Sequence, residues 1–161
     1  MALPRNIKLT TDNRTRLGSQ LLRLANRYDR ALSERLSRWH LAPSHYEMLK
    51  ILYSAPDYSL THSQLAEAMG VTLPSITLAA KKLGALRMVG SQRGTDRRSR
   101  VLTLTVKGAE MLGVLFDEYE GFASALFSSI TDAGAGTIEK SLLRLLSRLT
   151  ELQDQRRASA A

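Results

Sequence analysis

The 161-residue sequence predicts a mainly α-helical fold, in which two short helices joined by a tight turn are followed by a β-hairpin and flanked by long helices. Three observations predict it. Apolar residues recur at spacings of three and four near both ends of the chain, which is the helical period. Two neighbouring segments carry helix-capping signals on either side of Gly70. The pattern then changes to short extended segments within residues 89–104.

The first long helix is predicted within residues 12–40. Asp12 is suited to cap its amino terminus. One narrow apolar stripe follows, made of Leu17, Leu21, Leu24, Tyr28, Leu32 and Leu36. Because nothing nearby in the sequence covers this stripe, it requires a partner surface.

A second helix is predicted to begin near Pro43, a residue suited to a first helical turn. Ser44 and Glu47 have the spacing of a capping box. Pro56 ends this helix because proline cannot continue it.

The next short helix is marked at both ends. Thr61 and Gln64 have the spacing of a capping box, and Leu60 and Leu65 that of a hydrophobic staple. Gly70 can adopt the left-handed conformation that terminates a helix.

The last helix of this group follows at once, with Thr72 as its cap, and runs to about Leu86. Its predicted buried face is Ile76, Ala79, Ala80 and Leu83. Residues 89–93 and 98–104 are then typical of two strands joined by a turn at 94–97.

Two long amphipathic helices are predicted within residues 105–155. The first is marked by Ala109, Leu112, Phe116, Tyr119, Phe122 and Leu126, and the second by Ile138, Leu142, Leu145, Leu149 and Leu152.

The net charge of +8 is concentrated in one segment. Residues 81–107 hold eight Lys or Arg and one acid, a net charge of +7, which favours a polyanionic partner. There is no cysteine, and the three histidines lack metal-ligand spacing, so neither a metal nor a cofactor is predicted. No membrane-spanning or signal-peptide stretch is evident, and we expect a cytoplasmic protein that does not enter a membrane.

A helix, a three-residue turn, a second helix and a basic hairpin form the winged helix-turn-helix arrangement. Its second helix enters a major groove of DNA, where Thr72, Ser75 and Thr77 are placed to meet base edges. Lys81 and Lys82 lie further along and suit phosphates. For the three hydroxyl residues, helix capping and a solvated helix face remain alternatives.

The hairpin, or wing, carries the strongest charge signal. Four arginines on a short turn repel one another unless a polyanion neutralises them. Arg93, Arg97 and Arg100 are assigned to phosphates. An arginine at the tip can enter a minor groove, and Asp96 can hold a neighbouring guanidinium in place.

Residues 96–108 resemble the wing signature of the MarR family of bacterial regulators: Asp-x-Arg, a strand, Leu-Thr, and a Gly shortly after. The resemblance implies that Arg98 is the minor-groove arginine and Asp96 its brace. It also implies one MarR-like domain over residues 1–161, with a DNA-binding lobe at 42–104. The dimerisation helices would be 12–40 and 105–155, and the partner a second copy of the chain on a palindromic operator.

The sequence departs from the family at three places. Leu78 stands where the family often has Arg, Arg87 stands where it usually has Gly, and the loop before Asp96 is shorter.

The resemblance further implies a small aromatic acid or phenolic ligand bound between the lobes. Arg16, Trp39, His45 and Tyr46 are the candidates to bind it. Core packing is the alternative for Trp39 and Tyr46.

The sequence therefore predicts a homodimeric, sequence-specific repressor of double-stranded DNA that a small ligand releases. The alternative is a basic architectural protein that binds nucleic acid without sequence preference. An enzyme is not predicted, because the sequence has no nucleophile elbow or phosphate loop.

Overall fold

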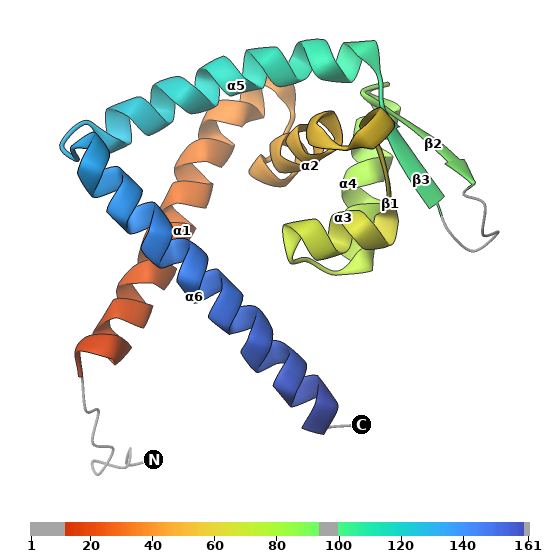
Figure 1. Ribbon diagram of the computed structural model, residues 1–161. Coiled ribbons are helices and arrows are strands. Elements are labelled where there is room, and N and C mark those ends of the chain that lie inside the picture. The colour runs from red at the N-terminus through yellow and green to blue at the C-terminus, as the bar shows by residue number, and fades with distance from the viewer. Residues whose placement is uncertain (1–11, 94–99, 160–161) are drawn as a thin grey trace, which may run out of the picture. The chain divides into compact units, whose positions relative to one another are not determined.

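A computed structural model describes residues 12–93 and 100–159, most of which are helical (Figure 1). Helix α1 spans Asn13–Leu36. Its start is as predicted, because the Asp12 carboxylate accepts a hydrogen bond of 2.7 Å from the backbone N–H of Thr15. A short 3₁₀ turn, Ser37–Trp39, follows α1.

Helix α2 spans Pro43–Ser54, and its capping differs from the prediction. The backbone N–H of Ala42 donates to Nδ1 of His45 at 2.9 Å. The predicted Ser44 and Glu47 capping box is therefore wrong. Because the helix begins at Pro43, the side chain that can reach back to the capping residue is His45, while Glu47 forms an ion pair within the helix.

The two short helices are α3, His62–Met69, and α4, Leu73–Ala85. The Thr61 and Gln64 capping box is confirmed, since the N–H of Thr61 donates to Oε1 of Gln64 at 2.9 Å and the N–H of Gln64 donates to Oγ1 of Thr61 at 3.2 Å. Gly70 has a φ of 64° and ends α3, as predicted.

The sheet has three antiparallel strands in the order β1, β3, β2. A short 3₁₀ turn, Pro56–Tyr58, leads into β1, Ser59–Thr61, while β2 is Val89–Arg93 and β3 is Arg100–Leu104. The predicted two-stranded wing corresponds to β2 and β3, and β1 is an additional strand that the sequence did not predict. The predicted fold class, mainly α with a winged helix-turn-helix, is confirmed.

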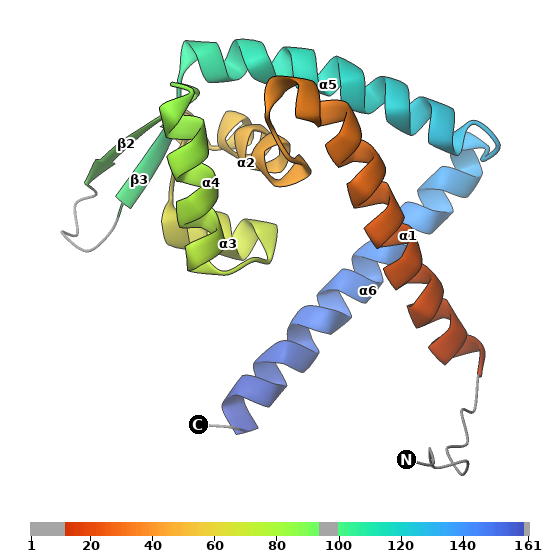
Figure 2. The ribbon, with the colours of Figure 1, turned by 180° about the vertical axis from the view of Figure 1, so that it is seen from behind.

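Helices α2, α3 and α4 pack with the sheet around one apolar core (Figure 2). The predicted inner face of α4 is buried. The core of this region includes Leu49, Leu52, Leu65, Ile76, Leu83 and Leu102, each at most 1% exposed. This packing fixes the orientation of α4 relative to β2 and β3.

Helix α5, Val106–Phe127, begins at a tight junction with the end of α4. The Thr105 hydroxyl lies 2.8 Å from the carbonyl oxygen of Arg87 and 3.0 Å from that of Met88, and it accepts a hydrogen bond of 3.0 Å from the N–H of Gly108. A Cβ on Gly108 would lie 2.1 Å from the Met88 carbonyl oxygen, so only glycine fits without a backbone shift. We call these four residues the Thr105 junction.

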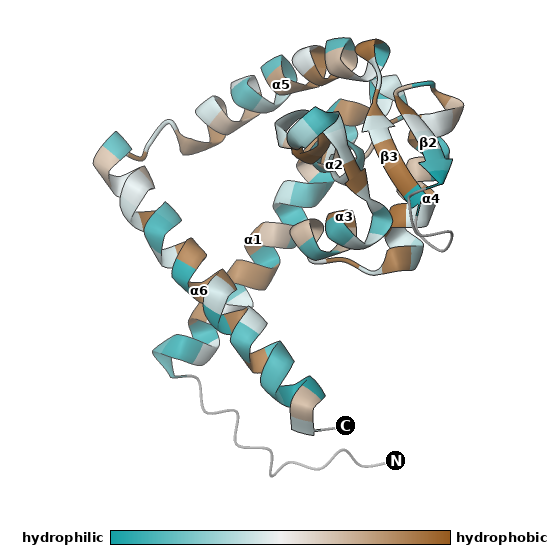
Figure 3. Ribbon diagram, turned by 45° about the vertical axis from the view of Figure 1, so that its right-hand side comes forward, coloured by the Kyte–Doolittle hydropathy of each residue, from teal (hydrophilic) through white to brown (hydrophobic). Residues whose placement is uncertain are grey.

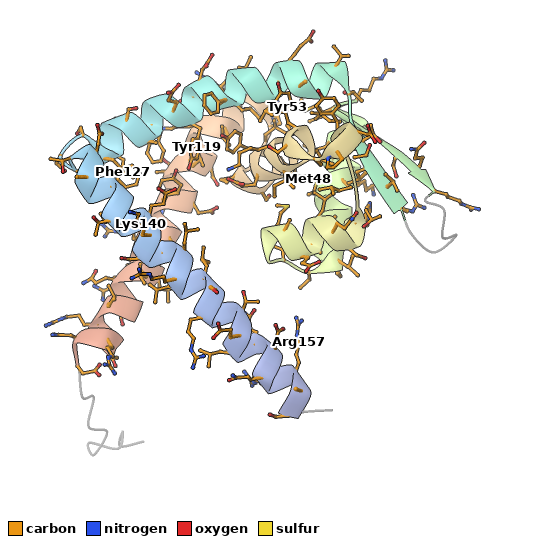
Figure 4. All side chains as sticks on the ribbon, in the orientation of Figure 1. Met48, Tyr53, Tyr119, Phe127, Lys140 and Arg157 are labelled. Atoms are coloured by element: carbon orange, nitrogen blue, oxygen red, sulfur yellow. The ribbon has the colours of Figure 1, made fainter. Side chains whose placement is uncertain are left out.

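Helices α1, α2 and α5 are joined by contacts among three tyrosines, of which Tyr119 lies on α5 (Figure 4). The rings of Tyr46 and Tyr119 stack with centroids 5.0 Å apart, and the ring of Tyr28 meets Tyr119 edge-on at 6.4 Å. Arg35 and Arg38 both contact the carboxylate of Glu118. These contacts fasten the carboxyl end of α1 to α5.

The chain divides into two compact units, residues 1–119 and 120–161, and α5 continues through the boundary. The second unit contains α6, Asp132–Ser159, in which none of the described residues is buried. Apolar and polar residues alternate along it (Figure 3). Its exposed apolar residues are Ile138, Leu142, Leu143, Leu145, Leu146, Leu149 and Leu152.

Candidate nucleic-acid interface

The start of α4 is built by hydroxyl residues that bond within the helix. The N–H of Ser75 donates to Oγ1 of Thr72 at 3.4 Å, and the two hydroxyl oxygens lie 3.0 Å apart. The Thr77 hydroxyl donates to the carbonyl oxygen of Leu73 at 3.0 Å. Thr72 therefore caps the helix, which was the alternative role for these three residues. All three side chains are exposed.

The outward face of α4 is cationic at its carboxyl end. Lys81 and Lys82 are both exposed and directly follow the buried pair Ala79 and Ala80. Because the inner face of α4 is fixed in the core, both ammonium groups are held on the side that faces solvent.

A shallow hollow of about 410 Å³ lies between the start of α2 and this helix. His45 and Lys82 border it, and its other lining residues are Ser44, Ser75, Leu78 and Ala79. Burial, and then the positive charge of Lys82, lowers the pKa of His45 below its usual value. The lowered pKa favours the neutral form of His45 beside this lysine.

The base of the wing places two arginines opposite each other. Arg93, the last residue of β2, pairs in register with Arg100, the first residue of β3, and both are exposed. Residues directly opposite in an antiparallel pair share one face of the sheet, where like charges destabilise the pair. A polyanion would remove this repulsion.

The predicted tip residues Asp96, Arg97 and Arg98 lie outside the described residues. The roles of Asp96 as a brace and Arg98 as a minor-groove contact stay predictions.

His62, the first residue of α3, lies near the wing base. Its Nε2 atom is buried and has no hydrogen-bond partner among the described residues. Burial, and then the charge of Arg100, lowers the pKa of His62. His62 could not be placed here from the sequence, because its proximity to the wing base depends on β1 pairing with β3.

The four predicted ligand-binding residues do not gather at one place. Tyr46 is 2% exposed and stacks on Tyr119, as core packing requires. Trp39 is half-buried with the Arg38 guanidinium 3.9 Å from its ring centroid. Arg16 is exposed near the start of α1, roughly 30 Å along the helix axis from its end. Of the four, His45 borders the hollow.

Two other features are absent from residues 12–93 and 100–159. No cluster of three His, Cys, Asp or Glu side chains there could hold a metal ion. In the same residues no helix is both long enough and apolar enough to cross a membrane.

No protein-family model matches the chain. Solved structures do match it. The transcriptional regulator BldR from Sulfolobus solfataricus superposes with a TM-score of 0.78 at 22% identity, over 85% of this chain and 96% of BldR. AbsC, a MarR family transcriptional regulator from Streptomyces coelicolor, gives 0.78 at 18% identity, over 90% and 99%.

A mutant MarR from E. coli, solved in complex with operator DNA, gives a TM-score of 0.73 at 21% identity. The match covers 84% of this chain and 99% of that protein. The predicted resemblance is confirmed at the level of the fold: the chain has the fold of the MarR family of transcriptional regulators.

Proposed function

We propose that this protein is a transcriptional regulator that binds double-stranded DNA sequence-specifically. The observation that carries the proposal is the cationic surface of α4 and the wing base, on a fold shared with a protein solved on its operator. Helix α4 enters a major groove with its outward face toward the bases, and the β2–β3 hairpin lies along the neighbouring backbone.

The predicted DNA contacts are of three kinds. Lys81, Lys82, Arg93, Arg97 and Arg100 bind phosphates, and Thr72, Ser75 and Thr77 approach base edges. Arg98, braced by Asp96, enters the minor groove.

The protein acts as a homodimer on a palindromic operator. The support is α6, which is roughly 42 Å long and carries a row of leucines about half exposed. A second copy would cover this row symmetrically and set two α4 helices about 34 Å apart, which is one turn of DNA.

The protein represses by occupying the operator, and a small aromatic acid or phenol releases it. The hollow beside Lys82 supports this step, because a carboxylate bound there competes with phosphate for the same ammonium group. Calorimetry with benzoate and hydroxybenzoates on the DNA-free protein tests it. Lys82→Ala should abolish binding, whereas Lys81→Ala should not, since Lys81 does not line the hollow. Equal binding to both variants would exclude this site.

Selection of binding sites from random duplexes tests the main proposal. We expect an enriched palindrome that binds at least a thousandfold more tightly than random duplex at matched salt. Lys81→Ala should weaken binding to both duplexes and lower the salt dependence by about one phosphate contact per half-site, about two for the dimer. Lys140→Ala on α6 (Figure 4) is the matched loss of one charge and should change neither.

Two results would contradict the proposal. Equal affinity for selected and random duplex would favour the architectural alternative. If Arg98→Ala bound the selected site with undiminished affinity, the minor-groove role of Arg98 would be wrong.

A further inference from the structure

Leu78 is a large apolar side chain on the outward face of α4. It is 72% exposed, more than any other large hydrophobic residue that the structure describes between residues 42 and 104. The next is Tyr53, at 54%. A leucine so exposed gains little from burial in the core, so its side chain is available for contact with a partner.

The helical geometry places Leu78 on the side of α4 away from the core, at the edge of the hollow that His45 and Lys82 border. Ile76, Ala79, Ala80 and Leu83 define the buried face of α4. With about 100° between successive residues, Leu78 lies roughly 150° from the middle of that face. Its neighbours on the outward side are Pro74 one turn before it and Lys81 and Lys82 one turn after it.

The hydroxyl groups around Leu78 are partly engaged within the helix. Thr77 uses its hydroxyl hydrogen on the carbonyl oxygen of Leu73, and Thr72 and Ser75 share a hydrogen bond. Leucine itself has no donor or acceptor. At its outermost point, α4 therefore presents an apolar surface rather than a hydrogen-bonding one.

From this geometry we propose that Leu78 packs against the 5-methyl group of a thymine in each half of the operator. The proposal rests on the proposed function and identifies one base of the operator that the protein recognises. The thymine methyl is the apolar group that base edges display in the major groove, so it is the match for an exposed aliphatic side chain. The positive charge of Lys81 and Lys82, one turn after Leu78 on the same helix, favours DNA as the partner of this surface.

The experiment removes the methyl group from the DNA and the side chain from the protein. After site selection, each thymine of a half-site is replaced in turn by deoxyuridine, which differs from it by the methyl group alone. We expect one position at which this change weakens binding about fourfold, and about fifteenfold when both half-sites are changed.

The double-mutant comparison assigns that methyl group to Leu78. In Leu78→Ala, which keeps a good helix former at an exposed position, the affinity for the thymine operator falls and deoxyuridine no longer matters. Lys81→Ala should bind more weakly but keep the full difference between thymine and deoxyuridine. Val106→Ala, which shortens an exposed aliphatic side chain outside α4, should also keep it.

Three results would overturn the inference. The first is a Leu78→Ala variant that still distinguishes thymine from deoxyuridine, and the second is a selected half-site without thymine. Both leave the proposed function standing, provided that a site is enriched. The third is the absence of any enriched site, which refutes the proposed function together with the inference.

Discussion

Replacing Gly108 with alanine tests the Thr105 junction, where the start of α5 meets the end of α4. The added Cβ would lie 2.1 Å from the Met88 carbonyl oxygen and 2.8 Å from Cδ1 of Leu104. The leucine side chain can rotate, but the carbonyl belongs to the backbone, so α5 or the chain at Met88 has to move by about 1 Å.

The cost follows from these contacts. Overpacking a well-filled site costs about 1–3 kcal/mol, and an obstruction made of backbone places Gly108→Ala at the upper end. The shift also lengthens the hydrogen bonds of the Thr105 hydroxyl, each of which contributes about 1 kcal/mol. Alanine regains about 1 kcal/mol through its higher helix propensity. We expect a net loss of about 3 kcal/mol in the free energy of unfolding.

Urea unfolding and thermal melting at one protein concentration measure this loss. In a chain of this length, 3 kcal/mol corresponds to a fall of about 6–12 °C in Tm. Gly113→Ala is the matched control, because Gly113 lies in the same helix and a Cβ there meets nothing within 4 Å. It should raise the stability by about 0.5–1 kcal/mol.

A Gly108→Ala variant as stable as the wild type, or changed as little as Gly113→Ala, would refute the close approach of α5 to Met88. It would also show that contact with the Met88 carbonyl oxygen is not the reason for a glycine at position 108, the last residue of the wing signature.

Three further predictions concern single side chains. Thr61→Ala removes the capping box of α3 and should cost about 1 kcal/mol in urea unfolding. Arg87→Gly should stabilise the protein by about 0.5–1 kcal/mol, because Arg87 has a φ of 60°, which glycine adopts without strain. His45 has a lowered pKa, so below pH 6.5 the unfolded chain binds its proton more readily than the folded one, and stability falls as the pH falls. His45→Asn, which keeps an acceptor for the Ala42 N–H, should reduce the loss between pH 7.5 and 5.5.

Each of these predictions has its own control. Ser63→Ala, in the same turn as the capping box, should change the stability far less than Thr61→Ala. Arg87→Ala removes the same charge but keeps a Cβ, so an equal gain from it would show that backbone strain is not the cause. An unchanged pH dependence in His45→Asn would show that His45 does not set it.

Several helix ends could be predicted because their signals are local, although the predicted capping box of α2 is wrong. Asp12, Thr61 and Thr72 each cap a helix through an atom three residues away, and the inner face of α4 follows from its period. The exposure of Lys81 and Lys82 follows from the same period. Arg87, which stands just after α4 where the family usually has Gly, has the left-handed φ of 60° that a glycine adopts easily.

The rest depends on partners far along the chain. Strand β1 has three residues, too few for an alternating pattern, and it is held by β3 through contacts such as the 2.8 Å approach of the Ser59 and Thr103 hydroxyl oxygens. The pairing of Arg35 and Arg38 with Glu118 spans about eighty residues. The sequence could not decide between ligand binding and core packing for Tyr46, because its stacking partner, Tyr119, cannot be identified from local pattern.

The Thr105 junction has a consequence for the thermodynamics of recognition. Arg87 and Met88 lie between α4 and β2, and Thr105 lies between β3 and α5. The hydrogen bonds between the Thr105 hydroxyl and the carbonyl groups of Arg87 and Met88 therefore hold the two connections together. The spacing between α4 and the strands of the wing is therefore set when the chain folds, before any partner arrives. Conformational entropy that a loosely linked helix and hairpin would lose on association is already lost in the free protein, so more of the contact energy appears as affinity.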